Sequence, residues 1–157
     1  MTEKTGTFVV THAERDSAVV QDVDTAQVHT LSSNPGLETR DVVEATVAPD
    51  PPLEVTWQVI EVADRRQIEL VDSDLEPTVL ARELAADADI GDLIREERAG
   101  TGEIHVLCVP ADGLDEAASD VLEDLETVSR AARLEAVRVE VRRSAEDEVL
   151  SVRYLPD

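Results

Sequence analysis

The sequence predicts an α+β protein. We expect a small N-terminal all-β barrel, OB-like or SH3-like, followed by a C-terminal unit of helix, hairpin, helix and hairpin. Three observations predict this class. Twenty-three valines favour strands, the first seventy residues show short strand-like runs, and the pattern turns helical beyond Pro77. We therefore expect a barrel over residues 1–72, a linker over 73–78 and an α+β domain over 79–157.

The N-terminal half contains valine-rich or alternating runs separated by turn residues such as Ser32–Gly36. The predicted strands are Gly6–Thr11, Ala18–Val23, Gln27–Leu31, Asp41–Val47, Val55–Val62 and Gln67–Val71. Strands at this spacing, without helices between them, favour a small closed barrel. Their order resembles that of oligonucleotide- and oligosaccharide-binding folds, and an SH3-like barrel fits about as well.

The C-terminal half begins with a short predicted helix that Thr78 caps and that runs through Asp87. Next, Leu93–Arg98 and Glu103–Val109 flank a glycine turn, which predicts a hairpin. A helix through Leu93–Arg98 is the alternative.

A longer helix is predicted after this hairpin, because apolar residues recur there at spacings of three and four. They are Leu114, Ala118, Val121, Leu125, Val128 and Ala132. Asp112 is the expected N-cap, and a kink is expected at Asp124–Thr127. Val137–Arg143 and Val149–Leu155 then predict a second hairpin.

The formal net charge is −22, with Lys4 as the only lysine, and the acidic residues are spread over both halves. Such a composition suits a cytoplasm with molar salt, where the Debye length is about 3 Å and self-repulsion is screened. Cys108 is the only cysteine, and no apolar run is long enough for a membrane helix. We therefore expect a halophilic, cytoplasmic protein without a membrane partner.

Four residues are candidates for ligand binding. Arg65 and Arg66 form a basic pair at the expected tip of a barrel hairpin, where guanidinium groups can bind phosphate or carboxylate. Pairing with neighbouring acids is the favoured interpretation of that pair. Trp57 is a candidate stacking platform but fits the core better. His105 is the fourth candidate, and an ordinary strand residue is its simpler interpretation.

No motif specifies catalysis, a metal or a cofactor. His105 and Cys108 are three residues apart, which on a strand directs their side chains to opposite faces. Gly100-Thr101-Gly102 lacks the following lysine of a P-loop and is better interpreted as a hairpin turn. Cys108 is expected to be a small buried hydrophobic residue. With 36 acidic residues, adjacent carboxylates carry almost no information about acid–base catalysis.

Several segments together resemble a family of uncharacterised haloarchaeal proteins known only as a domain of unknown function. These segments are Gly6–Val10, Gln27–Gly36, Ala48–Trp57 and Arg98–Leu107. The similarity spans most of the chain and implies a high-salt cytoplasm. It implies no activity, cofactor or catalytic residue.

We therefore expect a non-catalytic binding or adaptor module that engages a protein or a nucleic acid. Net charge does not exclude nucleic acid, because counterion release contributes little at molar salt. One alternative is a small enzyme with a dispersed site near His105 and the Gly100–Gly102 turn. Another is a homo-oligomeric structural protein that associates through the apolar face of the helix after Leu114.

Overall fold

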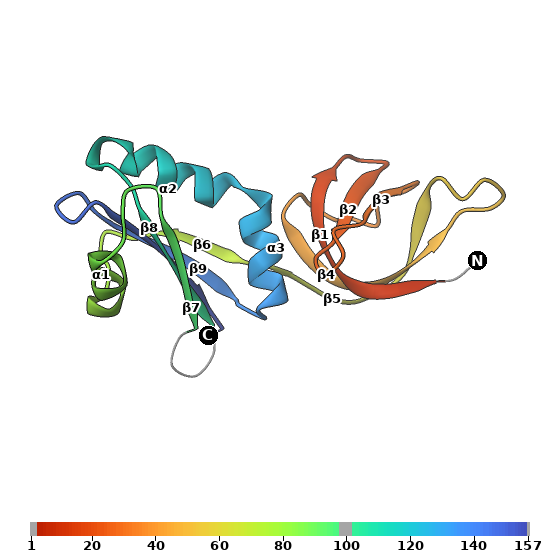
Figure 1. Ribbon diagram of the computed structural model, residues 1–157. Coiled ribbons are helices and arrows are strands. Elements are labelled where there is room, and N and C mark those ends of the chain that lie inside the picture. Colours follow the sequence, from red (N-terminus) through yellow and green to blue (C-terminus); the bar gives the residue numbers. More distant parts are fainter. Residues whose placement is uncertain (1–2, 98–101, 157) are drawn as a thin grey trace. The chain divides into compact units, whose positions relative to one another are not determined.

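A computed structural model describes residues 3–97 and 102–156. Over these residues the protein is α+β, with two five-stranded sheets and three α-helices (Figure 1). The chain divides into two compact units. One contains the residues up to Ile68 together with Val128–Arg133, and the other contains Glu69–Thr127 and the residues from Leu134 onward. No helix among the described residues is both long and apolar enough to cross a membrane.

The first sheet closes on itself as a barrel with the strand order β1-β2-β3-β5-β4. Its strands are β1 (Lys4–Ala13), β2 (Ala18–Asp22), β3 (Val28–Leu31), β4 (Asp41–Pro49) and β5 (Trp57–Gln67). All neighbouring strands are antiparallel except β3 and β5, which run parallel where Leu31 pairs with Trp57. Irregular register in β1 and at two points between β4 and β5 gives the local bends that closure requires.

The barrel interior is filled by alternate residues of these strands, as expected when side chains alternate across a strand. Phe8, Val10, Val20, Leu31 and Val43 are all at most 2% exposed and form one cluster. Val9 and Val42 lie between or beside these residues and are also buried, so in β1 and β4 both faces are covered over part of the strand.

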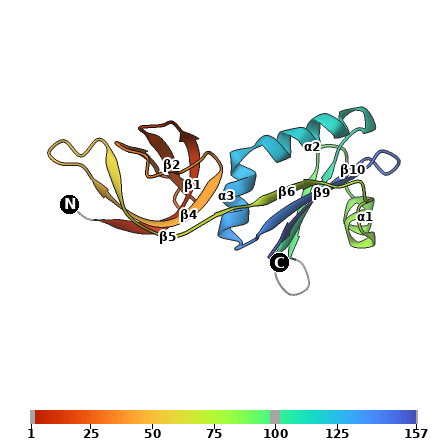
Figure 2. The same cartoon turned by 180° about the vertical axis from the view of Figure 1, so that it is seen from behind.

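The second sheet has the order β6-β9-β10-β8-β7. Figure 2 labels its strands β6, β9 and β10. Its strands are β6 (Glu69–Asp72), β7 (Leu93–Glu97), β8 (Glu103–Cys108), β9 (Arg138–Ser144) and β10 (Val149–Leu155). The helices of the chain are α1 (Val79–Ala86), α2 (Leu114–Glu123) and α3 (Leu125–Arg133). α1 packs on β8 and β10, where Ala81 meets Ile104, Val106 and Val149.

The chain segment around residue 70 differs from the sequence-based expectation. We expected residues 1–72 to belong to the barrel, with one strand over Gln67–Val71. Instead β5 ends at Gln67, and Glu69–Asp72 forms β6, which pairs in parallel with β9. Strand propensity indicates that a segment is extended, but it does not indicate which strand becomes its partner.

The predicted long helix is divided in two. α2 ends at Glu123, Asp124 has an extended backbone, and α3 begins at Leu125, within the region where a kink was expected. The predicted N-cap was wrong, because Gly113 occupies that position and Asp112 lies in a preceding 3₁₀ turn. Thr78 caps α1 as predicted, with its hydroxyl accepting from Ala81 N at 3.3 Å.

A strand and a helix were the two alternatives for Leu93–Arg98, and the described part of this segment, Leu93–Glu97, is a strand. β7 pairs with β8 in antiparallel register from Leu93 opposite Leu107 to Glu97 opposite Glu103. Arg98, Gly100 and Thr101, on which the predicted turn depends, lie outside the described residues.

Candidate ligand-binding sites

Arg65 and Arg66 lie near the end of β5, and their guanidinium groups have different surroundings. Arg65 Nε lies 2.7 Å from Asp41 Oδ2, a carboxylate whose side chain is only 2% exposed. Asp41 also accepts from Gln67 Nε2 at 2.7 Å. Arg66 Nε is buried and has no hydrogen-bond partner among the described residues. Arg65 is thus held by a carboxylate, and the two consecutive residues point to opposite faces of the strand.

Trp57 begins β5 and packs against the barrel core as a half-buried side chain. Its ring centroid lies 4.3 Å from that of His29, with an angle of 64° between the ring planes. Its carbonyl accepts from Ser32 N at 2.8 Å, a bond that joins the residue after β3 to the first residue of β5. The indole therefore contributes to the interior aromatic contacts of the barrel.

His105 lies on β8 in the other unit, whereas Arg65, Arg66 and Trp57 all lie on β5. It is 7% exposed, and its Nε2 lies 2.6 Å from Glu103 Oε1. Its ring lies 5.0 Å from that of Tyr154. No group of three or more potential metal ligands occurs in the described part of the chain.

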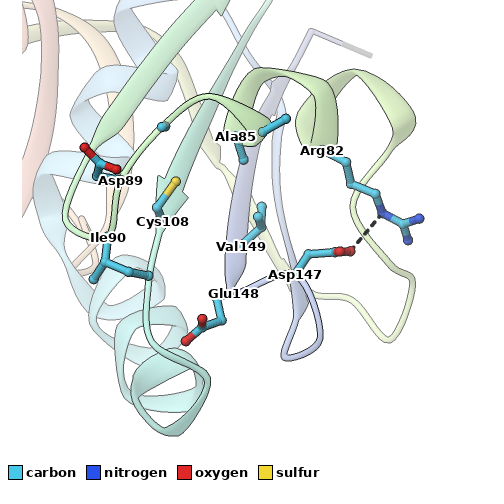
Figure 3. A pocket seen from close by; sticks show the side chains of 10 residues that line it. Arg82, Ala85, Asp89, Ile90, Cys108, Asp147, Glu148 and Val149 are labelled. Atoms are coloured by element: carbon cyan, nitrogen blue, oxygen red, sulfur yellow. Dashed lines mark ion pairs between the residues drawn. The ribbon is translucent and has the colours of Figure 1, made fainter.

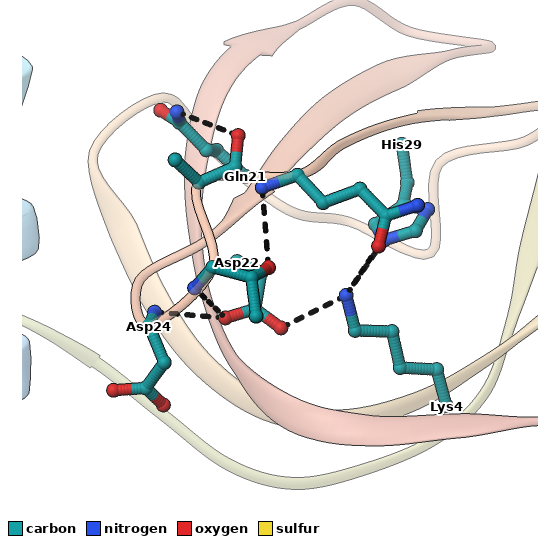
Figure 4. A network of polar contacts seen from close by, with 8 residues as sticks. Lys4, Gln21, Asp22, Asp24 and His29 are labelled. Atoms are coloured by element: carbon teal, nitrogen blue, oxygen red, sulfur yellow. Dashed lines mark hydrogen bonds and ion pairs between the residues drawn. The ribbon is translucent and has the colours of Figure 1, made fainter.

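A polar network that sequence reasoning missed lies at one end of the barrel (Figure 4). Lys4 Nζ donates to Gln27 Oε1 at 2.9 Å and lies 3.0 Å from Asp22 Oδ2. The same ammonium lies 3.3 Å from His29 Nε2. These residues come from β1, from β2, from β3 and from the β2–β3 turn, so no local spacing connects them. The only sequence feature that pointed to this network is that Lys4 is the single lysine of the chain.

His29 is 1% exposed, and its Nδ1 has no partner among the described residues. Because an ammonium group only donates, Nε2 must accept from Lys4, and the ring proton is then on Nδ1. Burial lowers the pKa of His29, and the charge of Lys4 lowers it further, although Asp22 acts in the opposite direction. His29 is therefore a neutral imidazole next to a cation.

Asp22 is the anion of this network and is 4% exposed. Burial raises its pKa, but hydrogen bonds from Lys4 and from the backbone N–H groups of Thr25 and Asp24 outweigh burial. The net effect is a pKa below the ordinary value, so Asp22 stays ionised and compensates the charge of Lys4.

A pocket of about 440 Å³ lies in the second unit, between α1, the loop that follows it and the ends of β8 and β10 (Figure 3). Its polar lining consists of Arg82, Asp89, Asp147 and Glu148, and Cys108 contributes a thiol. Arg82 Nη2 lies 2.5 Å from Glu76 Oε2, and Arg82 Nε lies 3.5 Å from Asp147 Oδ2. The guanidinium is therefore already neutralised by two carboxylates.

Cys108 is 6% exposed and lines this pocket. Burial raises the pKa of its thiol, and the charges of Asp92 and Asp89 raise it further. A thiol with a raised pKa is a poor nucleophile at neutral pH, because the thiolate is the reactive form. The cysteine therefore has the properties of a buried apolar group.

The comparisons with known proteins identify the family. The chain belongs to a family of unknown function, DUF5812, whose family model matches residues 4–143. No curated protein and no solved structure matches the chain.

Proposed function

We propose that the protein is a non-catalytic binding module of a high-salt cytoplasm, and that an OB-like barrel engages a protein partner through the hairpin between β4 and β5. Support for the OB-like class comes from the strand order β1-β2-β3-β5-β4 with parallel β3 and β5. Such barrels bind ligands on β2 and β3 and on the loops between β1 and β2 and between β4 and β5.

The β4–β5 hairpin presents two large apolar side chains to solvent. Leu53 is 79% exposed and Val55 is 74% exposed. An exposed apolar pair two residues apart, on a chain with a net charge of −22, suits burial against a partner. This pair is the observation that carries the proposal.

Three hydrogen bonds connect residues within the hairpin. Asp50 N donates to Thr56 O at 2.8 Å, and Thr56 Oγ1 donates to Asp50 Oδ2 at 2.9 Å. Glu54 N donates to Asp50 O at 2.8 Å. A loop that is already ordered loses little conformational entropy on binding, and this favours recognition by a folded partner.

The aromatic residues support a protein partner over a single-stranded nucleic acid. Nucleic-acid readers of this class stack bases on exposed aromatic rings. Phe8 is 0% exposed, and Trp57 packs against the barrel core. The more exposed positions of β2 and β3 are Val19, Gln21, Val28 and Thr30, none of which is aromatic or basic.

The test compares partner capture by the wild type, a Leu53→Asp/Val55→Asp variant and a Leu75→Asp control. Leu75 is 59% exposed and lies in the other unit. Affinity purification from a lysate of the source organism is performed at about 2 M KCl, where the Debye length is shorter than about 3 Å.

We expect a stoichiometric protein to be retained by the wild type and by the control but lost from the hairpin variant. Equal retention by all three would contradict the hairpin as the contact. Retention that nuclease treatment abolishes would indicate nucleic acid instead.

A further inference from the structure

The barrel is joined by the fewest backbone contacts between β3 and β5. Among the described residues only Leu31 and Trp57 pair across this junction, whereas β2 and β3 pair at four positions and β4 and β5 at nine. Ser32 adds two hydrogen bonds, from its N and its Oγ to the carbonyl of Trp57 at 2.8 and 3.2 Å. Few backbone bonds therefore have to break before β3 separates from β5.

The ring of His29 connects the two strands from inside the barrel. His29 lies on β3 and is 1% exposed. Its ring centroid lies 4.3 Å from that of Trp57 on β5 and 5.9 Å from that of Phe8 on β1. These ring contacts supplement the short backbone pairing, and they exist only while the imidazole stays in the interior.

The surroundings of His29 fit a neutral ring. Lys4 Nζ lies 3.3 Å from Nε2 of His29 and 3.0 Å from Asp22 Oδ2, so a carboxylate holds the ammonium next to the ring (Figure 4). The charged groups that act on His29 are thus Lys4 from β1 and Asp22 from β2, while Phe8 and Trp57 are uncharged. Burial and the charge of Lys4 lower the pKa of His29 more than Asp22 raises it.

A protonated ring would have no acceptor at either nitrogen. Nε2 accepts from Lys4 in the neutral ring, and after protonation it would present an N–H to an ammonium group that can only donate. Nδ1 is buried and has no partner among the described residues. An unpaired buried donor is costly, and a buried charge without a direct partner is more so, so a charged His29 is stable only when its ring reaches water.

We propose that His29 is a pH-sensitive switch of the barrel: when its ring takes up a proton it leaves the interior, and β3 separates from β5 while the other strand pairs remain. The open junction exposes the ring of Trp57 and unpaired backbone groups of β3 and β5, to which another strand can pair. The switch uses neither Leu53 nor Val55 and does not depend on the partner proposed for the hairpin.

Hydrogen exchange of the Ser32 amide measures this opening, because Ser32 N donates across the junction. The full chain is measured between about pH 7 and pH 5 in about 2 M KCl, where self-repulsion is screened. The opening constant of Ser32 should rise by up to about tenfold for each pH unit below about 6.5, since each opening takes up one proton. The rise should stop when the pH falls below the pKa of His29 in the closed barrel.

Two comparisons separate opening of the junction from unfolding of the whole barrel. The amide of Val23 donates to Thr7 O at 3.0 Å between β2 and β1, and it should exchange more slowly than that of Ser32 at every pH. The opening constant of Ser32 should change little in dilute urea, because separating one junction exposes little surface. Equal exchange of both amides, or a strong dependence on urea, would overturn the proposal.

Two variants test the role of the ring. His29→Gln takes up no proton, and its side-chain carbonyl can still accept from Lys4, so the opening constant of Ser32 should be independent of pH. Lys4→Gln removes the like charge and should weaken the pH dependence. Quenching by acrylamide of Trp57, the only tryptophan, should increase in acid for the wild type but not for His29→Gln. A pH-independent wild type, or an equal pH dependence in His29→Gln, would contradict the switch.

Discussion

His29 lies inside the barrel between aromatic rings and the ammonium of the only lysine. The rings of Phe8 and Trp57 lie 5.9 and 4.3 Å from its own. A protonated imidazole there would have lost its hydration and would face the like charge of Lys4 at 3.3 Å. The same features that lower its pKa therefore make the barrel sensitive to acid.

This sensitivity can be measured. The folded pKa of His29 lies below the 6.5 of the unfolded chain, so acid protonates the unfolded chain first. The stability that His29 contributes is complete above about pH 6.5 and is lost as the pH falls through the folded value. His29→Gln should flatten the free energy of unfolding between about pH 7 and pH 5 in urea titrations.

Glu140 is a second residue whose ionisation is coupled to folding. Arg142 and Arg153 both donate to its Oε1, the latter at 2.8 Å. Burial raises the pKa of Glu140, but these two hydrogen bonds and the charges of the arginines outweigh it and lower the pKa. Its contribution is thus present above about pH 4.5 and lost as the pH falls further.

Glu140→Gln should lower the free energy of unfolding at neutral pH by about 1–3 kcal/mol, since hydrogen bonds between charged groups are lost. The difference from the wild type should shrink in acid as Glu140 itself becomes protonated. Urea unfolding at several pH values measures both effects. Glu146→Gln, at an exposed acid, is the control. An equal loss at pH 7 and in acid would show that the charge of Glu140 is not responsible.

At the scale of the element, α1 depends on its N-cap because it has only eight residues. Helices of that length are marginal without tertiary contacts. Thr78→Ala should destabilise the second unit by about 1 kcal/mol, whereas Thr78→Ser should retain the bond to Ala81 N. Hydrogen exchange of the α1 amides is the measurement, and identical exchange in the Ala and Ser variants would contradict a capping role.

The break between α2 and α3 shows how local hydrogen bonds can end one helix and start another although the apolar spacing continues. Asp124 Oδ1 accepts from Glu126 N at 2.9 Å, the bond expected of a residue that caps the start of α3. Thr127 Oγ1 donates to Val121 O at 2.7 Å across the break. The apolar residues keep their helical spacing across the break, so this spacing alone predicted one helix. The capping carboxylate of Asp124 was the sequence feature that indicated two helices.

At the scale of the whole molecule, a net charge of −22 makes self-repulsion a major destabilising force in dilute buffer. We expect the unfolding temperature to rise as KCl increases from about 0.1 to 2 M, because the Debye length falls from about 10 to about 2 Å. Circular dichroism at a series of KCl concentrations measures this. Sucrose at matched osmolality controls for solvent exclusion. Unchanged melting in KCl would contradict adaptation to high salt.

Sequence reasoning was most successful where neighbours along the chain determine the structure. The valine-rich runs indicated strands, including one over Gly6–Thr11 that lies within β1, and Thr78 marked the start of α1. The family, whose model matches residues 4–143, was also recognisable from the sequence. Strand periodicity and helix caps act over two to four residues, so they can be read locally.

Only the tertiary structure decided which distant residues meet. β6 pairs with β9 from Glu69 opposite Arg138, and Lys4 meets Asp22 and His29 from three strands. Asp89, Cys108 and Glu148 line one pocket from three separate segments. Such contacts depend on which distant strands pair, and packing decides that pairing. No residue spacing in the sequence indicates which strands become neighbours.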